Sequence, residues 1–176
     1  MSLVMGILTQ DNHLILVADK RAKKDGIIND NFSKIFYLRE NLYFGITGIA
    51  EYGLEVKDLL QPQLNCSTEE IIRFADSIYT INETSSTIMI FGKLLNNRAF
   101  VWSKNSKGKV TYTETSIGNI SFTINTSINI KLIESKFIEE IKSSKVVNYE
   151  LAIKNTFEYA SIIDSSISSA YEVFKI

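Results

Sequence analysis

The sequence has little of the residue types that build disulfides and metal sites, since its 176 residues include one cysteine and one histidine. The single cysteine, Cys66, excludes a disulfide within the chain and a metal site built from several cysteines. The single histidine, His13, lies in a polar stretch predicted to be a turn, and there is no second histidine to share a metal ion. We therefore expect neither a metal ion nor a cofactor.

Charge of one sign and long apolar runs are also lacking. Lysine plus arginine number 19 against 20 aspartate plus glutamate, so no excess charge would attract nucleic acid or an anionic membrane. No apolar run approaches the roughly 20 residues that cross a bilayer, and no basic-then-apolar leader marks secretion. These absences favour a cytoplasmic protein that contacts neither membrane nor nucleic acid.

Two β-hairpins open the chain, and each is marked by two apolar runs around a short polar turn. The first joins SLVMGILT and LILVADKRA through QDNH, and the second joins KIFYL and LYFGITG through REN. The apolar period then changes from that of a strand to that of a helix after Gly48. The first fifty residues thus predict two strand pairs that lead into a helix.

The rest of the chain alternates pairs of helices with strands. A helix is expected between residues 49 and 60, before the only proline, Pro62. Ser67 with Glu70 forms a capping box that opens a second helix. Three strands follow, STIMIFGKL, AFVWSKN and VTYTETS, then helices over residues 129–142 and from Asn148, and a last strand, AYEVFKI. This order predicts one α+β domain over residues 1–176, with two packed antiparallel sheets and helices on each side.

Five motifs stand in order in the first fifty residues: Ser2, Gly6, VADKRA at 17–22, KIF at 34–36 and TGIA at 47–50. Their order and spacing resemble those of proteasome β-subunits and their bacterial relatives, the N-terminal-nucleophile (Ntn) hydrolases. In that family a Thr or Ser opens the mature chain, an Asp lies in an aDxR-like segment, a Lys begins a K-[IVL]-F strand, and a [TA]-G-x-x-[AG] turn leads into the first helix. The resemblance implies a four-layer αββα sandwich and a threonine- or serine-type peptidase.

Ser2 stands at the position of the family's nucleophile. If Met1 is removed, the α-amino group of Ser2, with an unperturbed pKa of about 7.7–8.0, can take the proton of its own hydroxyl. The alternative is that Ser2 only begins a strand.

Lys34 lies in the strand FSKIFYL, which carries apolar side chains on both faces, so its side chain is expected to be covered. A covered ammonium needs a compensating charge, and Asp19, at the end of a neighbouring strand, is the expected partner. The resemblance implies that Lys34 lowers the pKa of the Ser2 hydroxyl. The alternative is an edge-strand lysine that reaches water and an ordinary surface ion pair.

Gly48 precedes the first helix, where a backbone N–H can face a developing oxyanion near the positive end of the helix dipole. A plain turn residue is the alternative. Arg21 corresponds to a family arginine near the active-site cleft, although a solvated hairpin end is the simpler interpretation.

Two positions in the C-terminal half depart from the family pattern. Asn119 stands where the family has a serine before the third helix. Asp164 matches an aspartate near the nucleophile's amino group, but Ile167 stands where a serine should follow it. Ser166 or Ser168 would supply that hydroxyl after a small shift. The sequence therefore leaves two serines, Ser166 and Ser168, as alternatives for the hydroxyl that holds the α-amino group.

Register with Lys34 and Gly48 places four apolar residues around the substrate side chain beside the scissile bond: Ala22, Phe32, Ile46 and Ala50. No Asp or Glu lies at the base of this pocket, so a peptide or small amide with an uncharged apolar side chain is favoured. The resemblance also implies a homo-oligomer, in the form of a ring, and allows an ATPase partner.

Two hypotheses for the function follow. The first is an amide hydrolase that uses Ser2 as nucleophile and passes through an acyl-enzyme. The second is a catalytically silent homologue that serves as a structural or binding subunit.

Overall fold

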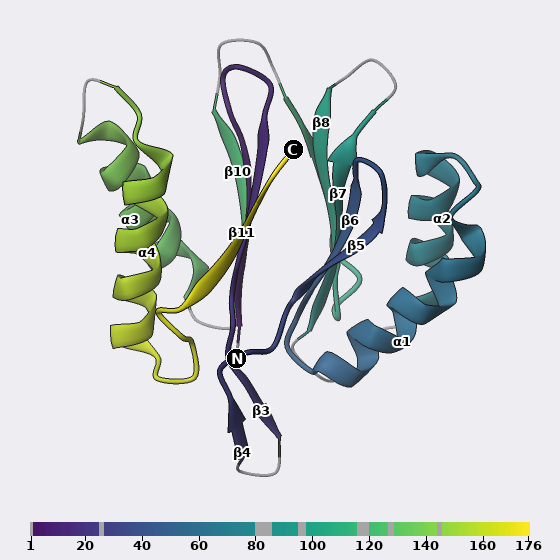
Figure 1. The fold of residues 1–176 in the computed structure, drawn as a ribbon, viewed down its shortest axis with the longest axis horizontal. Helices are drawn as coiled ribbons and strands as arrows, with labels where there is room; N and C mark the ends of the chain where they lie inside the picture. Colours follow the sequence, from purple (N-terminus) through teal and green to yellow (C-terminus); the bar gives the residue numbers. More distant parts are fainter. Residues whose placement is uncertain are drawn as a thin grey trace.

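The structure is a computed structural model, which describes residues 2–24, 27–79, 86–94, 98–115, 120–126, 129–143 and 146–176. Within these ranges lie eleven β-strands and four α-helices, arranged as two antiparallel sheets of four and five strands and a separate two-stranded hairpin. The α+β class predicted from the sequence is confirmed. Figure 1 shows the two sheets packed against each other, with one pair of helices on the outer side of each.

The first sheet has the strand order β10-β1-β2-β11, so the N-terminal hairpin lies in its centre. Its strands are β1 (Leu3–Leu8), β2 (Leu14–Asp19), β10 (Ser121–Thr126) and β11 (Tyr171–Lys175). Helices α3 (Ile130–Lys142) and α4 (Tyr149–Ile163) cover its outer face (Figure 1). Asn148 caps α4, as predicted, by accepting a hydrogen bond from the Leu151 N–H. The hairpin that carries Gly6 and Asp19 therefore has a neighbouring strand on each side.

The second sheet has the strand order β5-β6-β7-β8-β9. Its strands are β5 (Ile35–Arg39), β6 (Leu42–Thr47), β7 (Thr87–Lys93), β8 (Ala99–Asn105) and β9 (Val110–Glu114). Its outer face packs against α1 (Ala50–Leu60) and α2 (Thr68–Ile78), with the short 3-10 helix η1 (Gln61–Gln63) between them. The Ser67–Glu70 capping box is present at the start of α2. No helix in the described part of the chain is long and apolar enough to cross a membrane.

Strand β1 is buried on both faces, which explains why its sequence is a continuous apolar run. Leu3 and Met5 face the core under α3 and α4, whereas Val4 faces the second sheet. Gly6 also faces the second sheet, where an added Cβ would lie 2.8 Å from the Val101 side chain. The glycine therefore permits the close approach of the two sheets.

A two-stranded hairpin extends the N-terminal half beyond the sheets. β2 ends at Asp19, as expected, but the hairpin that follows, β3 (Ala22–Lys24) and β4 (Ile27–Asn29), was not predicted. This hairpin projects from the body near the N-terminus (Figure 1). Ile27 and Ile28 are 73% and 55% exposed. Asp19 thus lies where the backbone leaves the sheet and not inside a longer strand.

Candidate active site

Ser2 and Asp19 lie at the same end of the first sheet because β1 begins where its antiparallel neighbour β2 ends. Val4 is paired with Ala18 across the two strands. The N–H of Leu3, the residue after Ser2, donates a 2.7 Å hydrogen bond to Asp19 Oδ1. Ser2 and Asp19 are both buried, with 3% and 0% of their surfaces exposed.

Lys34 reaches the same carboxylate from the second sheet. Its Nζ lies 2.6 Å from Asp19 Oδ1, and only 3% of its side chain is exposed. Burial lowers the pKa of Lys34, and the charge and hydrogen bond of Asp19 oppose that shift. Lys34 is therefore a covered ammonium with a carboxylate partner, not an edge-strand lysine that reaches water.

The second oxygen of Asp19 binds two further backbone groups. Asp19 Oδ2 accepts hydrogen bonds from the N–H of Arg21 at 3.1 Å and from the N–H of Ser168 at 3.4 Å. One carboxylate thus gathers the start of β1, the end of β2, the side chain that enters β5 and the segment before β11. Asp19 is the common point of the site.

Gly48 lies just after β6 and has φ of 84°, in the left-handed region that favours glycine. It is followed by Ile49, the N-cap residue of α1, which supplies no side-chain cap. The first N–H groups of α1 therefore lack the side-chain acceptor that caps α2 at its own start. The Ile46 N–H, two residues before Gly48, donates to the Lys34 carbonyl at 3.0 Å, which ties this turn to Lys34.

The segment after α4 contains Asp164, which is the C-cap residue of that helix. Its Oδ1 accepts a 2.8 Å hydrogen bond from the Ser166 N–H, while Asp164 Oδ2 and Ser166 Oγ are buried without a partner among the described residues. Ile167, at the family's serine position, is buried in the core under α3 and α4. The Ser168 hydroxyl accepts a bond from the Ala170 N–H. Of the two candidate serines, Ser166 has the hydroxyl with unused bonding capacity.

The Arg21 side chain makes hydrogen bonds to two other segments, which the side chain of a solvated hairpin end would not make. Its Nε donates to Asp30 at 2.5 Å, and its Nη1 donates to the Ser165 carbonyl at 2.6 Å. It therefore joins the base of the β3–β4 hairpin to the segment that carries Asp164.

Three of the four predicted pocket residues lie in one apolar cluster. Phe32, Ile46 and Ala50 all belong to the core between the second sheet and helices α1 and α2. Ile46 is buried against Gly53 of α1, so little of its side chain faces outward. Ala22 is half-buried in the hairpin strand β3. Asn119 lies outside the described residues.

Glu172 of β11 was missed by the sequence interpretation, although it contacts the site directly. Its Oε1 accepts hydrogen bonds from the backbone N–H of Lys34 at 2.9 Å and of Ile35 at 3.2 Å. A single carboxylate in the short last strand gives no local signal of a partner 138 residues away.

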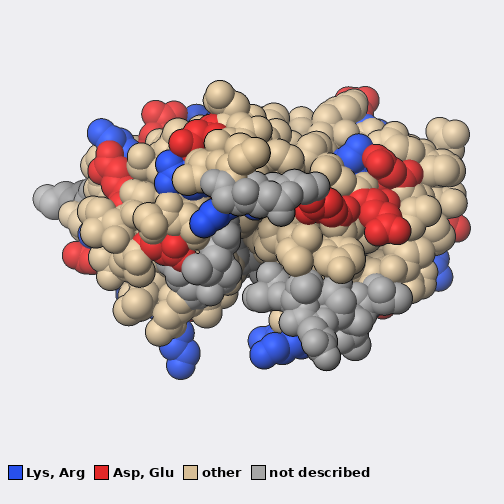
Figure 2. All heavy atoms as spheres, turned by 90° about the horizontal axis from the view of Figure 1, so that it is seen from below, with Lys and Arg blue, Asp and Glu red and all other residues tan. Residues whose placement is uncertain are grey.

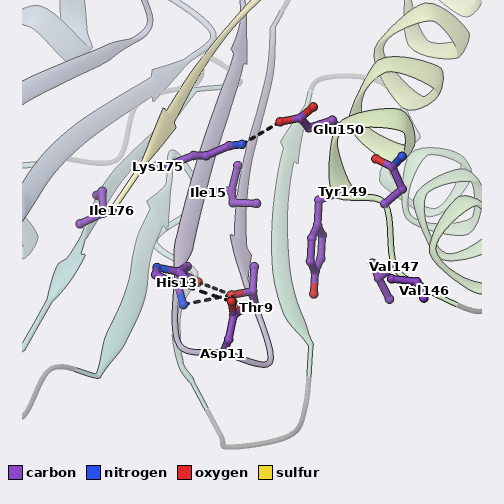
Figure 3. Close-up of a pocket in the computed structure, with 11 residues that line it drawn as sticks. Thr9, Asp11, His13, Ile15, Val146, Val147, Tyr149, Glu150, Lys175 and Ile176 are labelled. Carbon is purple, nitrogen blue, oxygen red and sulfur yellow. Dashed lines mark hydrogen bonds and ion pairs between the residues drawn. The ribbon is translucent and has the colours of Figure 1, made fainter.

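The cavity in Figure 3 lies at the opposite end of the first sheet. It has a volume of about 810 Å³, and residues of the β1–β2 turn, the start of α4 and the end of β11 line it: Thr9, Asp11, His13, Ile15, Val146, Val147, Asn148, Tyr149, Glu150, Lys175 and Ile176. Since β1 is six residues long, the two ends of the sheet are about 20 Å apart at roughly 3.4 Å per residue. The cavity therefore does not contain the Ser2 group.

In the described part of the face that holds the N-terminal end, neither sign of charge dominates. Figure 2, seen from that end, shows acidic and basic side chains mixed with each other and not gathered by sign. Across the described ranges, no three His, Cys, Asp or Glu side chains are placed to hold a metal ion. The buried polar side chains at this end include those of Ser2, Asp19 and Lys34.

Comparison with known proteins finds a match in structure only. Neither a protein-family model nor a curated protein sequence matches this chain. The crystal structure of eukaryotic HslV from Trypanosoma brucei matches it with a TM-score of 0.72, over 98% of each chain and at 10% sequence identity. At that identity the match establishes the fold alone, and this chain therefore has an HslV-like fold.

Proposed function

We propose that this chain is an N-terminal-nucleophile amide hydrolase of the proteasome type, built as an αββα sandwich, with Ser2 as its nucleophile. HslV is a proteasome-family Ntn threonine peptidase, and its fold spans almost the whole chain. One observation carries the proposal: the buried Lys34–Asp19 ion pair lies against the backbone N–H of the residue that follows Ser2. A buried ion pair stabilises a fold poorly, so a functional role is the better account of its presence.

The reaction begins once the residue before Ser2 has been removed. The α-amino group of Ser2 then accepts the proton of the Ser2 hydroxyl, and the oxygen attacks the carbonyl carbon of the amide. The Lys34 ammonium favours the alkoxide form of that oxygen electrostatically. The C–N bond breaks, the amine leaves with the proton, and water hydrolyses the resulting ester to restore Ser2.

The oxyanion of the tetrahedral intermediate is assigned to the N–H of Gly48. Its left-handed backbone directs the chain into α1, whose first N–H groups supply a favourable dipole.

Asp164 and Ser166 are assigned to hold the α-amino group. Their two unpartnered buried oxygens need donors, and an ammonium supplies up to three. The segment that carries them is tied to Asp19 by the Ser168 N–H and to Arg21 through the Ser165 carbonyl. Ser166 thereby takes the role that Ile167 is unable to fill.

The substrate is a peptide or small amide whose side chain enters the apolar region formed by Ala22, Phe32 and Ala50, with Ile46 behind them. We further propose a homo-oligomeric ring in the cytoplasm, with an ATPase as a candidate partner. The exposed Ile27 and Ile28 beside the site support a subunit contact, because apolar side chains on a two-stranded hairpin gain stability when they are covered.

The experiment that tests the proposal compares peptide hydrolysis by the wild type, Ser2→Ala and Ser2→Thr, each with the preceding residue removed. We expect Ser2→Ala to lose hydrolysis and Ser2→Thr to retain it, because the chemistry needs a hydroxyl beside the α-amino group. Ser77→Ala is the control, since it removes a hydroxyl from an exposed position on α2. Equal hydrolysis by Ser2→Ala and the wild type would place the site elsewhere.

The second candidate function, a catalytically silent subunit, is favoured by Ile167, whose side chain is buried in the core where the family has a hydroxyl. The intact mass of the natively expressed protein separates the two functions. A mature chain that keeps a residue before Ser2 has no α-amino base there and supports the silent subunit.

A further inference from the structure

Glu172 joins the last strand of the first sheet to the segment that enters the second. It lies opposite Ala18 in the β11–β2 pair, next to the pairing of Tyr171 with Asp19. Both of its carboxylate oxygens lie 2.9 Å from the Ser33 hydroxyl. Together with the N–H groups of Lys34 and Ile35, this makes three donors from consecutive residues on one carboxylate.

The backbone of Lys34 is consequently held from both sheets. Its N–H is bound by Glu172 of β11, and its carbonyl accepts from the Ile46 N–H of β6. Its side chain is bound by Asp19 of β2. Removing Glu172 would free the Lys34 N–H but leave the Lys34 carbonyl and side chain bound. The contribution of Glu172 can therefore be measured separately from that of Asp19.

We propose that Glu172 is a positioning residue for Lys34. Its carboxylate holds the backbone N–H of Lys34 in place and stabilises the positive charge of the Lys34 side chain. This inference rests on the proposed Ser2 chemistry, where Lys34 must be both in place and protonated. Nothing in the sequence motifs assigns Glu172 a role. Glu172 joins β11 to the start of β5 through its carboxylate and not through backbone pairing between strands. The contact therefore fixes the position of the Lys34 backbone and also places a negative charge near the Lys34 ammonium.

The charged groups that face Lys34 come from three places. Burial lowers the pKa of Lys34 most; Asp19 on β2 and Glu172 on β11 raise it, and Arg21, just after β2, lowers it. Glu172 is therefore one of two carboxylates that keep the ammonium protonated against burial. Neutralising Glu172 should make Lys34 lose its proton at a lower pH.

Two substitutions separate the geometric role from the electrostatic one. Glu172→Gln keeps a carbonyl oxygen for the N–H groups of Lys34 and Ile35 but removes the charge. We expect near wild-type kcat at neutral pH and an alkaline limb of the rate profile that moves to lower pH. Glu172→Ala removes both acceptor and charge, and we expect kcat to fall about 100-fold with KM little changed, since a displacement of about 1 Å has an effect of that order.

Glu150→Gln and Glu150→Ala are matched controls. Glu150 is an exposed carboxylate at the start of α4, and it pairs at 2.8 Å with Lys175, which lies on β11 as Glu172 does but at the far end of the sheet. Neither control should change kcat or the pH profile. Such a pair of variants distinguishes loss of a particular carboxylate from loss of any carboxylate near β11.

Titration of Lys34 by ¹³C NMR, in wild type and Glu172→Gln, tests the inference without relying on activity. A lower Lys34 pKa in Glu172→Gln supports it, and so does a kcat loss confined to Glu172→Ala. An unchanged Lys34 pKa together with an unchanged kcat in Glu172→Ala would overturn it. If the wild type hydrolyses nothing, the proposed function fails, and the titration alone still decides whether Glu172 acts on Lys34. Should Glu172→Ala fail to fold, Glu172→Gln carries the decision.

Discussion

The two ends of the first sheet handle charge in opposite ways. At the end that holds Ser2, Asp19 and Lys34 are almost fully buried and bind each other at 2.6 Å. At the other end, beside the cavity in Figure 3, Lys175 and Glu150 bind each other with 58% and 79% of their side chains exposed. This cavity therefore lies beside charges that water already solvates, and the buried charges lie at the opposite end of the sheet.

This difference decides which end is the better candidate for the proposed chemistry. Removing an ammonium and a carboxylate from water costs several kcal/mol per ion, and their attraction returns little more than that cost. Exposed ion pairs carry little of that cost. Perturbed, buried titratable groups are typical of catalytic sites, so the buried end is the better candidate even though the cavity lies at the other end.

The largest effect is expected at Asp19. Asp19→Ala leaves Lys34 buried without its partner and removes the acceptor of the N–H groups of Leu3, Arg21 and Ser168. We expect the free energy of unfolding to fall by at least about 3–5 kcal/mol, measured by urea denaturation. Glu150→Ala, which breaks the exposed ion pair with Lys175 at the other end, should cause no measurable change. Equal shifts in the two variants would remove the distinction between the ends.

A double substitution sharpens the comparison. Lys34→Met alone should destabilise by about 3–5 kcal/mol because it leaves the Asp19 carboxylate buried and unpaired. Lys34→Met combined with Asp19→Asn should recover much of that loss, since no buried charge is left, while hydrolysis stays absent. A double variant that is as unstable as the sum of the single ones would show that the pair is not coupled.

The pH dependence should separate activity from stability. Because burial lowers the pKa of Lys34, the folded protein loses this proton at a lower pH than the unfolded chain does. Between those two values the unfolded chain binds more protons, so the contribution of Lys34 to the free energy of unfolding rises with pH. Hydrolysis should therefore fall at alkaline pH, below the ordinary lysine pKa, before the protein unfolds. A loss of activity that coincides with unfolding in urea titrations would contradict this assignment.

The smallest effect is expected at Thr9, at the cavity end. Its buried hydroxyl donates to Asp11 at 2.6 Å and accepts from the His13 N–H at 3.0 Å. Thr9→Val should lower the free energy of unfolding by about 1 kcal/mol and leave hydrolysis unchanged. A loss of hydrolysis in this variant would show that the two ends are linked.

The sequence predicts the local parts of this structure and misses the links between distant parts. Apolar runs around short polar turns predict the two N-terminal hairpins, and two apolar faces predict that Lys34 is covered. Strand β10 (Ser121–Thr126) was not predicted because SFTINT has only two apolar residues, and it becomes a strand by pairing with β1. The β3–β4 hairpin was also not predicted, because each of its strands is only three residues long.

The site shows the same limit. Ser2, Asp19, Lys34 and Gly48 were named from motifs within the first fifty residues. Glu172 was not, because its partners lie on another sheet and a lone glutamate in a strand usually faces water. Contacts between a carboxylate and residues far away in the sequence depend on tertiary packing, which the local spacing of apolar residues does not predict.

The most direct test of the central claim is covalent labelling of Ser2. The wild type, with the preceding residue removed, is treated with a β-lactone that acylates N-terminal nucleophiles, and the modified peptide is identified by mass spectrometry. We expect one adduct on the Ser2 hydroxyl, none in Ser2→Ala and far less in Lys34→Met. Hydrolysis of peptides by a protein whose Ser2 stays unmodified, or equal labelling of Ser2→Ala, would contradict the account.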